Sequence, residues 1–266
     1  MALVTCALRS GSKGNCIYVG NEHEGVLVDV GISAKCALDS LKEVGINYKN
    51  IKAILITHEH SDHISGVRVL NKKLNVPIIA SKGTLDYMEN NKKLADNTQI
   101  ISVSSENSFY LNNFEILPFD IPHDANEPVG YRIYVDGQSC SVVTDLGFFP
   151  KKIQNFVEGS DIIYLESNHD IDMLNKNSNY PEFLKKRILS RKGHLDNSTC
   201  ANNITKLCSL GTKHFVLSHL SENNNAQDLA YQKTYTTLLA ANAEPDYDFS
   251  LSVANYYSIS NIYRIK

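Results

Sequence analysis

One seven-residue segment, Thr57-His58-Glu59-His60-Ser61-Asp62-His63, constrains this chain more than any other feature. It follows the apolar run Ile54-Leu55-Ile56, which predicts a strand covered on both faces. In extended chain, His58 and His60 point the same way and can share a metal ion, and a turn into a helix can direct the last two polar side chains toward a second ion. Imidazole and carboxylate ligands suit Zn²⁺, Fe²⁺ or Mn²⁺. A polar loop with chance histidines explains this concentration poorly, because the whole chain of 266 residues has nine histidines.

The composition is that of a globular protein. With 266 residues, 42% hydrophobic and 21% charged, the chain can form one large α/β domain. No apolar run approaches the roughly 20 residues that span a bilayer, and the N-terminus lacks the pattern of a signal peptide. The six cysteines include no Cys-x-x-Cys pair, which indicates reduced thiols. We therefore expect a cytoplasmic protein that makes no membrane contact, and no obligate protein partner can be inferred.

Short apolar runs alternate with helix-like stretches along the chain. This pattern predicts two sheets face to face with helices outside, in one domain over residues 1–266. Neither repeats nor linker-like segments interrupt it. We expect strands at 26–29, 51–56, 140–144 and 215–218. Helices are expected at 34–44, 64–74 and 198–210, the last capped by Ser198 or Thr199. Hairpin turns are expected at Asn112-Asn113 and Asp136-Gly137.

The histidine-rich segment resembles the H-x-H-x-D-H signature of the metallo-β-lactamase superfamily, and Leu27-Val28-Asp29-Val30-Gly31 resembles the strand and turn that precede it there. Three further residues follow in the family order: His123, Asp145 and His219. Each comes just past an apolar run, where the loops at strand ends build sites.

The resemblance implies the αββα four-layer sandwich, with two mixed β-sheets flanked by helices. It also implies a site for two divalent metal ions, Zn or Mn with Fe possible. Asp29 would have a supporting role and accept backbone hydrogen bonds under the histidine-rich segment, residues 57–63, which we call the metal loop. Redox relatives carry glutamate at the position of His60, so the resemblance favours hydrolysis. By this likeness one metal is held by His58, His60 and His123, and the other by Asp62, His63 and His219. Asp145 bridges the two metals, and Asp62 is also expected to be a catalytic residue.

Glu166 and His194 look like the Glu–His pair of RNase Z-like phosphodiesterases. In that relation His194 would protonate the leaving oxygen, and Glu166 would orient the ring and raise its basicity. A structural ion pair is the alternative interpretation.

Within the superfamily, the chain resembles the YycJ/WalJ-like branch, which is associated with exonuclease activity on DNA and with bacterial cytoplasm. The segments that carry this likeness are Ser10-Gly11-Ser12-Lys13-Gly14-Asn15, Glu166-Ser167-Asn168-His169-Asp170, Tyr180-Pro181, Gly193-His194-Leu195-Asp196-Asn197 and Leu217-Ser218-His219-Leu220-Ser221. On this likeness the candidate substrate-contacting or supporting residues are Ser12, Asn15, His169 and Asn197.

Positive charges precede His194 in the runs Lys185-Lys186-Arg187 and Arg191-Lys192. Such a run is usually a solvated helix face. It can also form a basic ridge that meets a phosphate backbone, with Lys185 and Arg187 as candidate substrate residues. A local ridge matters because the net charge of −3 argues against a protein that coats nucleic acid by charge alone.

The expected function is therefore that of a dinuclear-metal hydrolase. Two metals about 3.5–4 Å apart can generate a bridging hydroxide near neutral pH and clamp the attacking and leaving oxygens. The expected substrate is nucleic acid, DNA rather than RNA. Two alternatives stay open: a glyoxalase-like thioester or lactone hydrolase, which needs neither the Glu–His pair nor the ridge, and a metal-binding regulatory protein without turnover, which needs no open dinuclear site.

Overall fold

The computed structural model describes residues 2–266. The chain divides into two compact units, and the boundary lies inside one strand, between Ser139 and Cys140. The first unit comprises Met1–Asp120, Ala125–Ser139 and Asn255–Lys266, and the second comprises Ile121–Asp124 and Cys140–Ala254. The single domain expected over residues 1–266 stays a prediction, and the units are described in turn.

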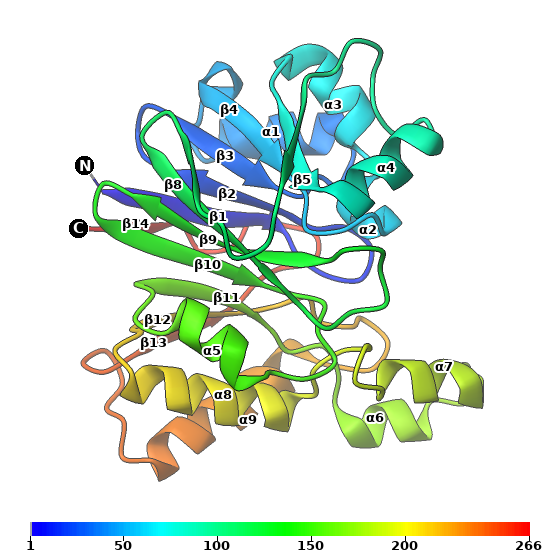
Figure 1. Cartoon of the computed structure of the whole chain (residues 1–266). Coiled ribbons are helices and arrows are strands. Elements are labelled where there is room, and N and C mark those ends of the chain that lie inside the picture. Colours follow the sequence, from blue (N-terminus) through cyan, green and yellow to red (C-terminus); the bar gives the residue numbers. More distant parts are fainter. Residues whose placement is uncertain (1) are drawn as a thin grey trace. The chain divides into compact units, whose positions relative to one another are not determined.

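The first unit contains a mixed seven-stranded sheet with the order β14-β1-β2-β3-β4-β5-β6. The pairs from β14 to β3 are antiparallel and those from β3 to β6 are parallel (Figure 1). The strands are β14 (Tyr263–Ile265), β1 (Leu3–Arg9), β2 (Cys16–Gly20), β3 (Gly25–Val28), β4 (Ile51–Leu55), β5 (Ile78–Ser81) and β6 (Ile100–Val103).

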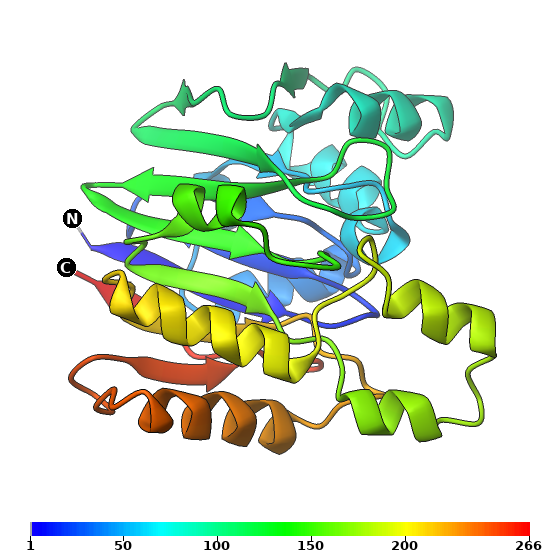
Figure 2. The ribbon, with the colours of Figure 1, turned by 60° about the horizontal axis from the view of Figure 1, so that its bottom comes forward.

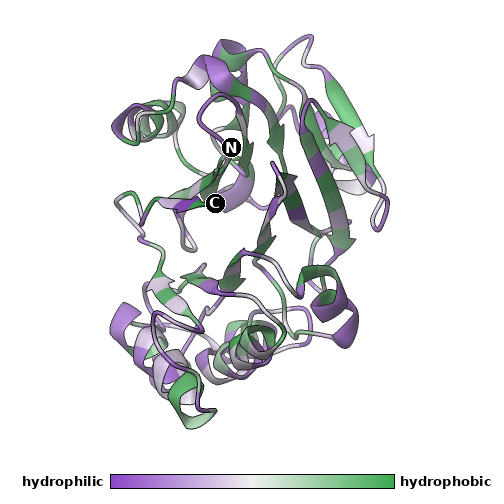
Figure 3. Cartoon of the chain, turned by 90° about the vertical axis from the view of Figure 1, so that its left-hand side faces the viewer, coloured by the Kyte–Doolittle hydropathy of each residue, from purple (hydrophilic) through white to green (hydrophobic). Residues whose placement is uncertain are grey.

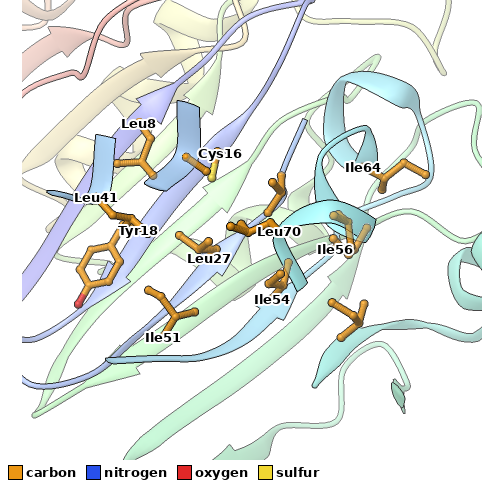
Figure 4. Packing of buried hydrophobic residues seen from close by; sticks show 14 of the residues in the cluster. Leu8, Cys16, Tyr18, Leu27, Leu41, Ile51, Ile54, Ile56, Ile64 and Leu70 are labelled. Carbon is orange, nitrogen blue, oxygen red and sulfur yellow. The ribbon is translucent and has the colours of Figure 1, made fainter. Parts of the chain in front are cut away.

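Helices of the first unit bury apolar side chains against this sheet. Helix α1 (Ala34–Glu43) contributes Leu41, α3 (Val67–Leu74) contributes Leu70, and both join the strand residue Leu27 in one core (Figure 4). The unit also contains the short helix η1 (Tyr48–Asn50) and α4 (Lys82–Asn90).

The helix expected at 64–74 is confirmed over 67–74, but its start is wrong, because residue 64 ends a separate short helix. Helix α2 (Ser61–Ile64) ends before Gly66, and α3 begins after it. The Gly66 amide donates to the Val30 carbonyl at 2.8 Å, and a Cβ at Gly66 would lie 1.8 Å from the Ile32 carbonyl oxygen. The Gly66 amide therefore serves a neighbouring loop and not the preceding turn of a continuous helix, and only a glycine fits this close approach.

The remaining strands form a second mixed sheet with the order β13-β12-β11-β10-β9-β8-β7. In the first unit β7 (Phe109–Leu111), β8 (Phe114–Asp120) and β9 (Val129–Val135) pair antiparallel. The expected hairpin turns are confirmed: Asn112, Asp136 and Gly137 have left-handed φ angles of 52°, 51° and 89°.

In the second unit, parallel pairing links β10 (Gln138–Val143), β11 (Ile162–Glu166), β12 (His214–Ser218) and β13 (Ser250–Val253). Helices α8 and α9 pack on one another, and α9 packs on β13 (Figure 2). The helices are α5 (Lys151–Val157), α6 (Ile171–Lys176), α7 (Glu182–Ile188), α8 (Asn197–Ser209) and α9 (Gln227–Ala240).

The cap of α8 differs from the expectation. Asp196, and neither Ser198 nor Thr199, is the N-cap residue, and its Oδ1 accepts the backbone N–H groups of Ser198 and Thr199 at 2.8 and 3.0 Å. Because the cap precedes both expected residues, the helix begins at Asn197.

The predicted fold class is confirmed as two mixed sheets flanked by helices. In Figure 3 the strands are mostly hydrophobic, while the helices carry both hydrophobic and hydrophilic residues. Among residues 2–266, the helices include none long and apolar enough to cross a membrane.

The close approach at Gly31 gives the first testable prediction. A Cβ at this position would lie 1.6 Å from the Asp62 carbonyl oxygen, so Gly31→Ala must displace the backbone at the start of α2. We expect it to lower the free energy of unfolding by about 3 kcal/mol, measured by urea denaturation. Gly45→Ala is the control, since a Cβ there meets no atom within 4 Å. Its free energy of unfolding should fall by only about 1 kcal/mol, because of the left-handed φ of 79°. Equal losses in the two variants would contradict the packing argument.

Candidate metal centre

Two neighbouring parallel strands of the first unit end at the histidine-rich segment. Strands β3 and β4 pair in parallel, with Val28 opposite Leu55, so the residues after them emerge at the same sheet edge. Asp29 follows β3 in a left-handed conformation with φ 60°, and its amide donates to the Leu55 carbonyl at 2.8 Å. This backbone conformation is uncommon and somewhat strained for a non-glycine residue, although in this chain it also occurs in turns such as that at Asp136.

Asp29 organises the segment through three hydrogen bonds. Its Oδ1 accepts the Thr57 amide at 2.8 Å, and its Oδ2 accepts the Thr57 hydroxyl at 2.8 Å and His63 Nδ1 at 2.7 Å. Because the Thr57 hydroxyl gives its proton to Asp29, it can only accept from His58 Nδ1, which lies 3.0 Å away. Both imidazoles are therefore fixed with a proton on Nδ1 and a lone pair on Nε2.

The lone pairs face further ligand atoms within the same segment. His58 Nε2 lies 3.0 Å from His60 Nδ1, and His63 Nε2 lies 3.4 Å from Asp62 Oδ2. His58 and His63 are fully buried, while Asp62, in the first turn of α2, keeps 21% of its side chain exposed. The first unit thus presents imidazole and carboxylate donors in an arrangement that suits a divalent cation.

In the second unit the polar residues also lie at the ends of parallel strands. Glu166 is the last residue of β11, opposite Ser218 of β12, while Asp145 follows β10 and His219 follows β12. Asp145 and His219 have left-handed φ angles of 61° and 55°. The strain found at Asp29 therefore recurs at two candidate ligands of this unit.

Glu166 is the centre of this arrangement. Its side chain is fully buried, and the charge of His194 together with hydrogen bonds from His194 and His219 lowers its pKa although burial alone would raise it. Both carboxylate oxygens are used. They accept five hydrogen bonds, from the backbone N–H groups of Asp145 (3.2 Å), Leu146 (3.1 Å) and Leu195 (2.9 Å) and from Nδ1 of His194 (2.9 Å) and His219 (2.8 Å).

The neighbouring histidines are oriented in the same way. His194 and His219 donate from Nδ1 to Glu166, and His123 Nδ1 donates to the Gly193 carbonyl at 3.3 Å. Burial lowers the pKa of His123, so this ring is neutral, as a metal ligand must be. Burial also opposes the charged form of His194, but the adjacent Glu166 carboxylate outweighs it and raises the His194 pKa.

Asp145, Glu166, His194 and His219 each offer a ligand atom, and these atoms all lie within 4.8 Å of one another. The occupied oxygens of Glu166 make it a support for its neighbours. The groups of this set suited to a metal are then the Asp145 carboxylate and the His219 imidazole. His123 belongs with them, since its Nε2 lies 3.8 Å from Asp145 Oδ1.

Of the expected substrate residues in the first unit, Asn15 is buried, and its side-chain nitrogen Nδ2 lies 3.2 Å from His63 Nε2, in the metal loop. Ser12 is exposed on the loop that precedes it. Of the two, Asn15 contacts a candidate ligand.

In the second unit, His169 and Asn197 are 1% and 4% exposed. Asn197 accepts the Ser167 hydroxyl at 2.7 Å, so its place is structural, and neither ring nitrogen of His169 has a hydrogen-bond partner among the described residues. In this conformation neither side chain is open to a substrate.

The basic residues of α7 contact acceptors of their own unit. Lys185 Nζ donates to the Asn175 carbonyl at 2.6 Å, which ties α7 to the segment of α6. Arg187 forms an ion pair with Asp124 and keeps 52% of its side chain exposed. Asp124 in turn lies 3.4 Å from His123 Nε2, so the basic helix connects to a candidate ligand.

Several supporting residues escaped the sequence analysis. Thr57 relays hydrogen bonds between Asp29 and His58, and Asn168 Nδ2 donates to the His219 carbonyl at 2.9 Å, which helps hold the left-handed backbone there. Glu59 accepts the backbone and side-chain N–H groups of Asn126, both at 2.8 Å, and so fixes the loop after β8. The available signal was position, since Thr57 and Glu59 adjoin candidate ligands.

Comparison with known proteins agrees with this geometry. A model of the beta-lactamase superfamily domain matches residues 25–220. The chain is 36% identical to Exodeoxyribonuclease YycJ of Bacillus anthracis, over 86% of this chain and 87% of that protein. It is 37% identical to Exodeoxyribonuclease WalJ of Streptococcus pneumoniae, over 92% of this chain and 91% of that protein. The metallo-β-lactamase fold protein YhfI of Bacillus subtilis superposes with a TM-score of 0.72 at 15% identity, over 98% of this chain and 99% of that one.

These likenesses bear out the expected family and enzyme class. The superposition on YhfI shows the fold, and the two relatives support the prediction of a metal-dependent hydrolase. Since the family model covers most of the chain and both relatives match it over nearly their whole length, this chain belongs to the β-lactamase superfamily and to its metal-binding hydrolases.

Proposed function

We propose that this chain is a DNA exonuclease that hydrolyses phosphodiester bonds with two divalent metal ions. The observation that carries the proposal is the likeness, at 36% and 37% identity, to two proteins named exodeoxyribonucleases. The choice of DNA over RNA rests on the same likeness. A cytoplasmic location is part of the proposal and is supported by the six free cysteines, which suit a reducing compartment.

The proposed ligands come from both units. His58, His60 and His123 would hold one ion, Asp62, His63 and His219 the other, and Asp145 would bridge them. Support comes from each unit separately, because the Nδ1 atoms of His58, His63, His123 and His219 are committed to fixed acceptors. Their Nε2 atoms are then the ring nitrogens that would serve as ligands in the proposed site. When bound, the ions would activate water and neutralise phosphate charge, and Zn or Mn suits this donor set.

In the proposed reaction His194 delivers a proton to the leaving oxygen. Its Nδ1–H is held by Glu166 at 2.9 Å, so the Nε2 position is the one that can carry and release a proton. The buried carboxylate raises the His194 pKa, which keeps a larger fraction of the ring protonated near neutral pH. With 18% of its side chain exposed, His194 is open to a substrate.

Contacts to the phosphate backbone would come from α7. Lys185 and Arg187 lie on this helix, Lys185 partly exposed and Arg187 with 52% of its side chain exposed. Such a local ridge would offset the net charge of −3 where the substrate binds.

Asp145→Asn is expected to slow turnover of bis(p-nitrophenyl) phosphate by about 100-fold or more, and to release at least one bound metal. Asparagine tolerates the left-handed φ of 61°, so the fold should survive. Activity with Mn²⁺ or Zn²⁺ and metal content by mass spectrometry are the measurements. Asp136→Asn is the matched control, because Asp136 has a similar φ of 51° and lies in a hairpin turn. Full activity of Asp145→Asn would refute the ligand assignment.

His194→Ala is expected to slow a dinucleotide, whose leaving group is a poor one, by about 100-fold or more. Hydrolysis of bis(p-nitrophenyl) phosphate should change far less, because nitrophenolate needs no proton to leave. His23→Ala, at an exposed histidine, is the control. Equal slowing of both substrates would mean that His194 is not the general acid.

A side-by-side assay separates the proposed nuclease from the thioester hydrolase. The purified protein with Mn²⁺ or Zn²⁺ should shorten end-labelled DNA faster than RNA of the same sequence, and should leave a glutathione thioester unhydrolysed at the same protein concentration. Rapid thioester hydrolysis without DNA degradation would reject the nuclease. Faster degradation of RNA would reject only the choice of DNA.

A further inference from the structure

The loop of residues 10–15 is built directly on the metal loop of the first unit. The Asn15 amide donates to the Asp62 carbonyl at 2.8 Å, and the Gly31 amide donates to the Asn15 carbonyl at 2.8 Å. A Cβ at Gly14 would lie 2.7 Å from the Gly31 carbonyl oxygen. The backbone of this loop therefore has a fixed position relative to the candidate ligands Asp62 and His63.

A second loop, residues 255–260, is fixed beside the first. The Ser10 amide donates to the Asn255 carbonyl at 3.0 Å, and the Ser260 amide donates to the Ala7 carbonyl at 2.9 Å. Within the loop, the Asn255 amide donates to Ser260 Oγ at 2.9 Å. The two loops thus form one support that belongs entirely to the first unit.

Each loop contributes one side chain to the same exposed spot. Lys13 Nζ donates to the Tyr257 hydroxyl at 3.5 Å, and the Tyr257 side chain is 69% exposed. The Tyr256 ring lies 6.1 Å from the Tyr257 ring. A single exposed tyrosine is ordinary on a protein surface. Here, however, an ammonium group accompanies the ring on a support that is hydrogen-bonded to the metal loop.

We propose that Lys13 and Tyr257 form a nucleotide subsite for single-stranded nucleic acid, in which Tyr257 stacks on a base and Lys13 pairs with a backbone phosphate. This inference rests on the proposed nuclease function and specifies how the strand is held beside the reacting phosphate. A ring face accepts any base, and an adjacent cation meets the repeating phosphate charge, which is the combination used to bind single strands without sequence preference. The acidic chain as a whole offers no general attraction to DNA, so local groups must provide it.

The test compares binding and turnover in variants of the whole protein. Tyr257→Ala should weaken binding of a single-stranded oligonucleotide by about tenfold or more, and Tyr257→Phe, which keeps the ring, should bind like the wild type. Binding is followed with metal-free protein through the fluorescence of 2-aminopurine placed along the strand, which stacking quenches. Tyr110→Ala is the matched control, since Tyr110 is 75% exposed in the same unit.

Lys13→Ala should reduce the slope of log binding constant against log salt concentration by about one. Lys93→Ala, at another exposed lysine of the first unit, should leave the slope unchanged. Turnover of bis(p-nitrophenyl) phosphate, which has no neighbouring nucleotide, should stay within about twofold of wild type in both Tyr257→Ala and Lys13→Ala.

The outcomes separate the subsite from the function on which it rests. If the wild type binds and degrades the oligonucleotide while Tyr257→Ala and Lys13→Ala behave like their controls, the subsite is wrong and the nuclease stands. A wild-type protein that hydrolyses a thioester but neither binds nor degrades the oligonucleotide would overturn both. Loss of bis(p-nitrophenyl) phosphate turnover in Tyr257→Ala would assign Tyr257 to the structure of the metal loop and also overturn the subsite.

Discussion

A hydrogen bond from imidazole Nδ1 to a buried carboxylate is the interaction on which the candidate site depends. It occurs once in each unit with a candidate ligand, between His63 and Asp29 and between His219 and Glu166. In a low-dielectric interior such charge-assisted bonds are strong and directional. They fix the tautomer and the plane of each ring, so the metal-facing nitrogen is set before any cation arrives.

The sheets supply the positions for these bonds. Asp29, Asp145 and His219 each follow a strand and adopt left-handed φ angles of 60°, 61° and 55°. Each is a costly backbone conformation that the surrounding hydrogen bonds must hold. At His219 the Asn168 side chain holds the carbonyl at 2.9 Å. At these three positions the left-handed backbone turns the side chain away from the strand direction and toward the candidate site of its unit.

The sequence predicted what is local and missed what depends on distant contacts. Continuous apolar runs marked β3, β4 and β12, and the residues after them could be picked out as candidate ligands because polar groups directly follow buried strands. The break between α2 and α3 was missed because it comes from the hydrogen bond of the Gly66 amide to the distant Val30 carbonyl. Glu166 was assigned a single partner, whereas it serves five donors drawn from separate loops, which no spacing in the sequence reveals.

The shared oxygen of Glu166 has a consequence for how the site responds to its ligands. Oε1 accepts both His194 and His219, at 2.9 and 2.8 Å, and it also receives the Asp145 amide at 3.2 Å. A change in charge on one of these two imidazoles alters how strongly Oε1 accepts the hydrogen bond from the other. A cation bound at His219 would therefore be coupled to protonation of His194, and the free energy by which one alters the other would be the same in both directions.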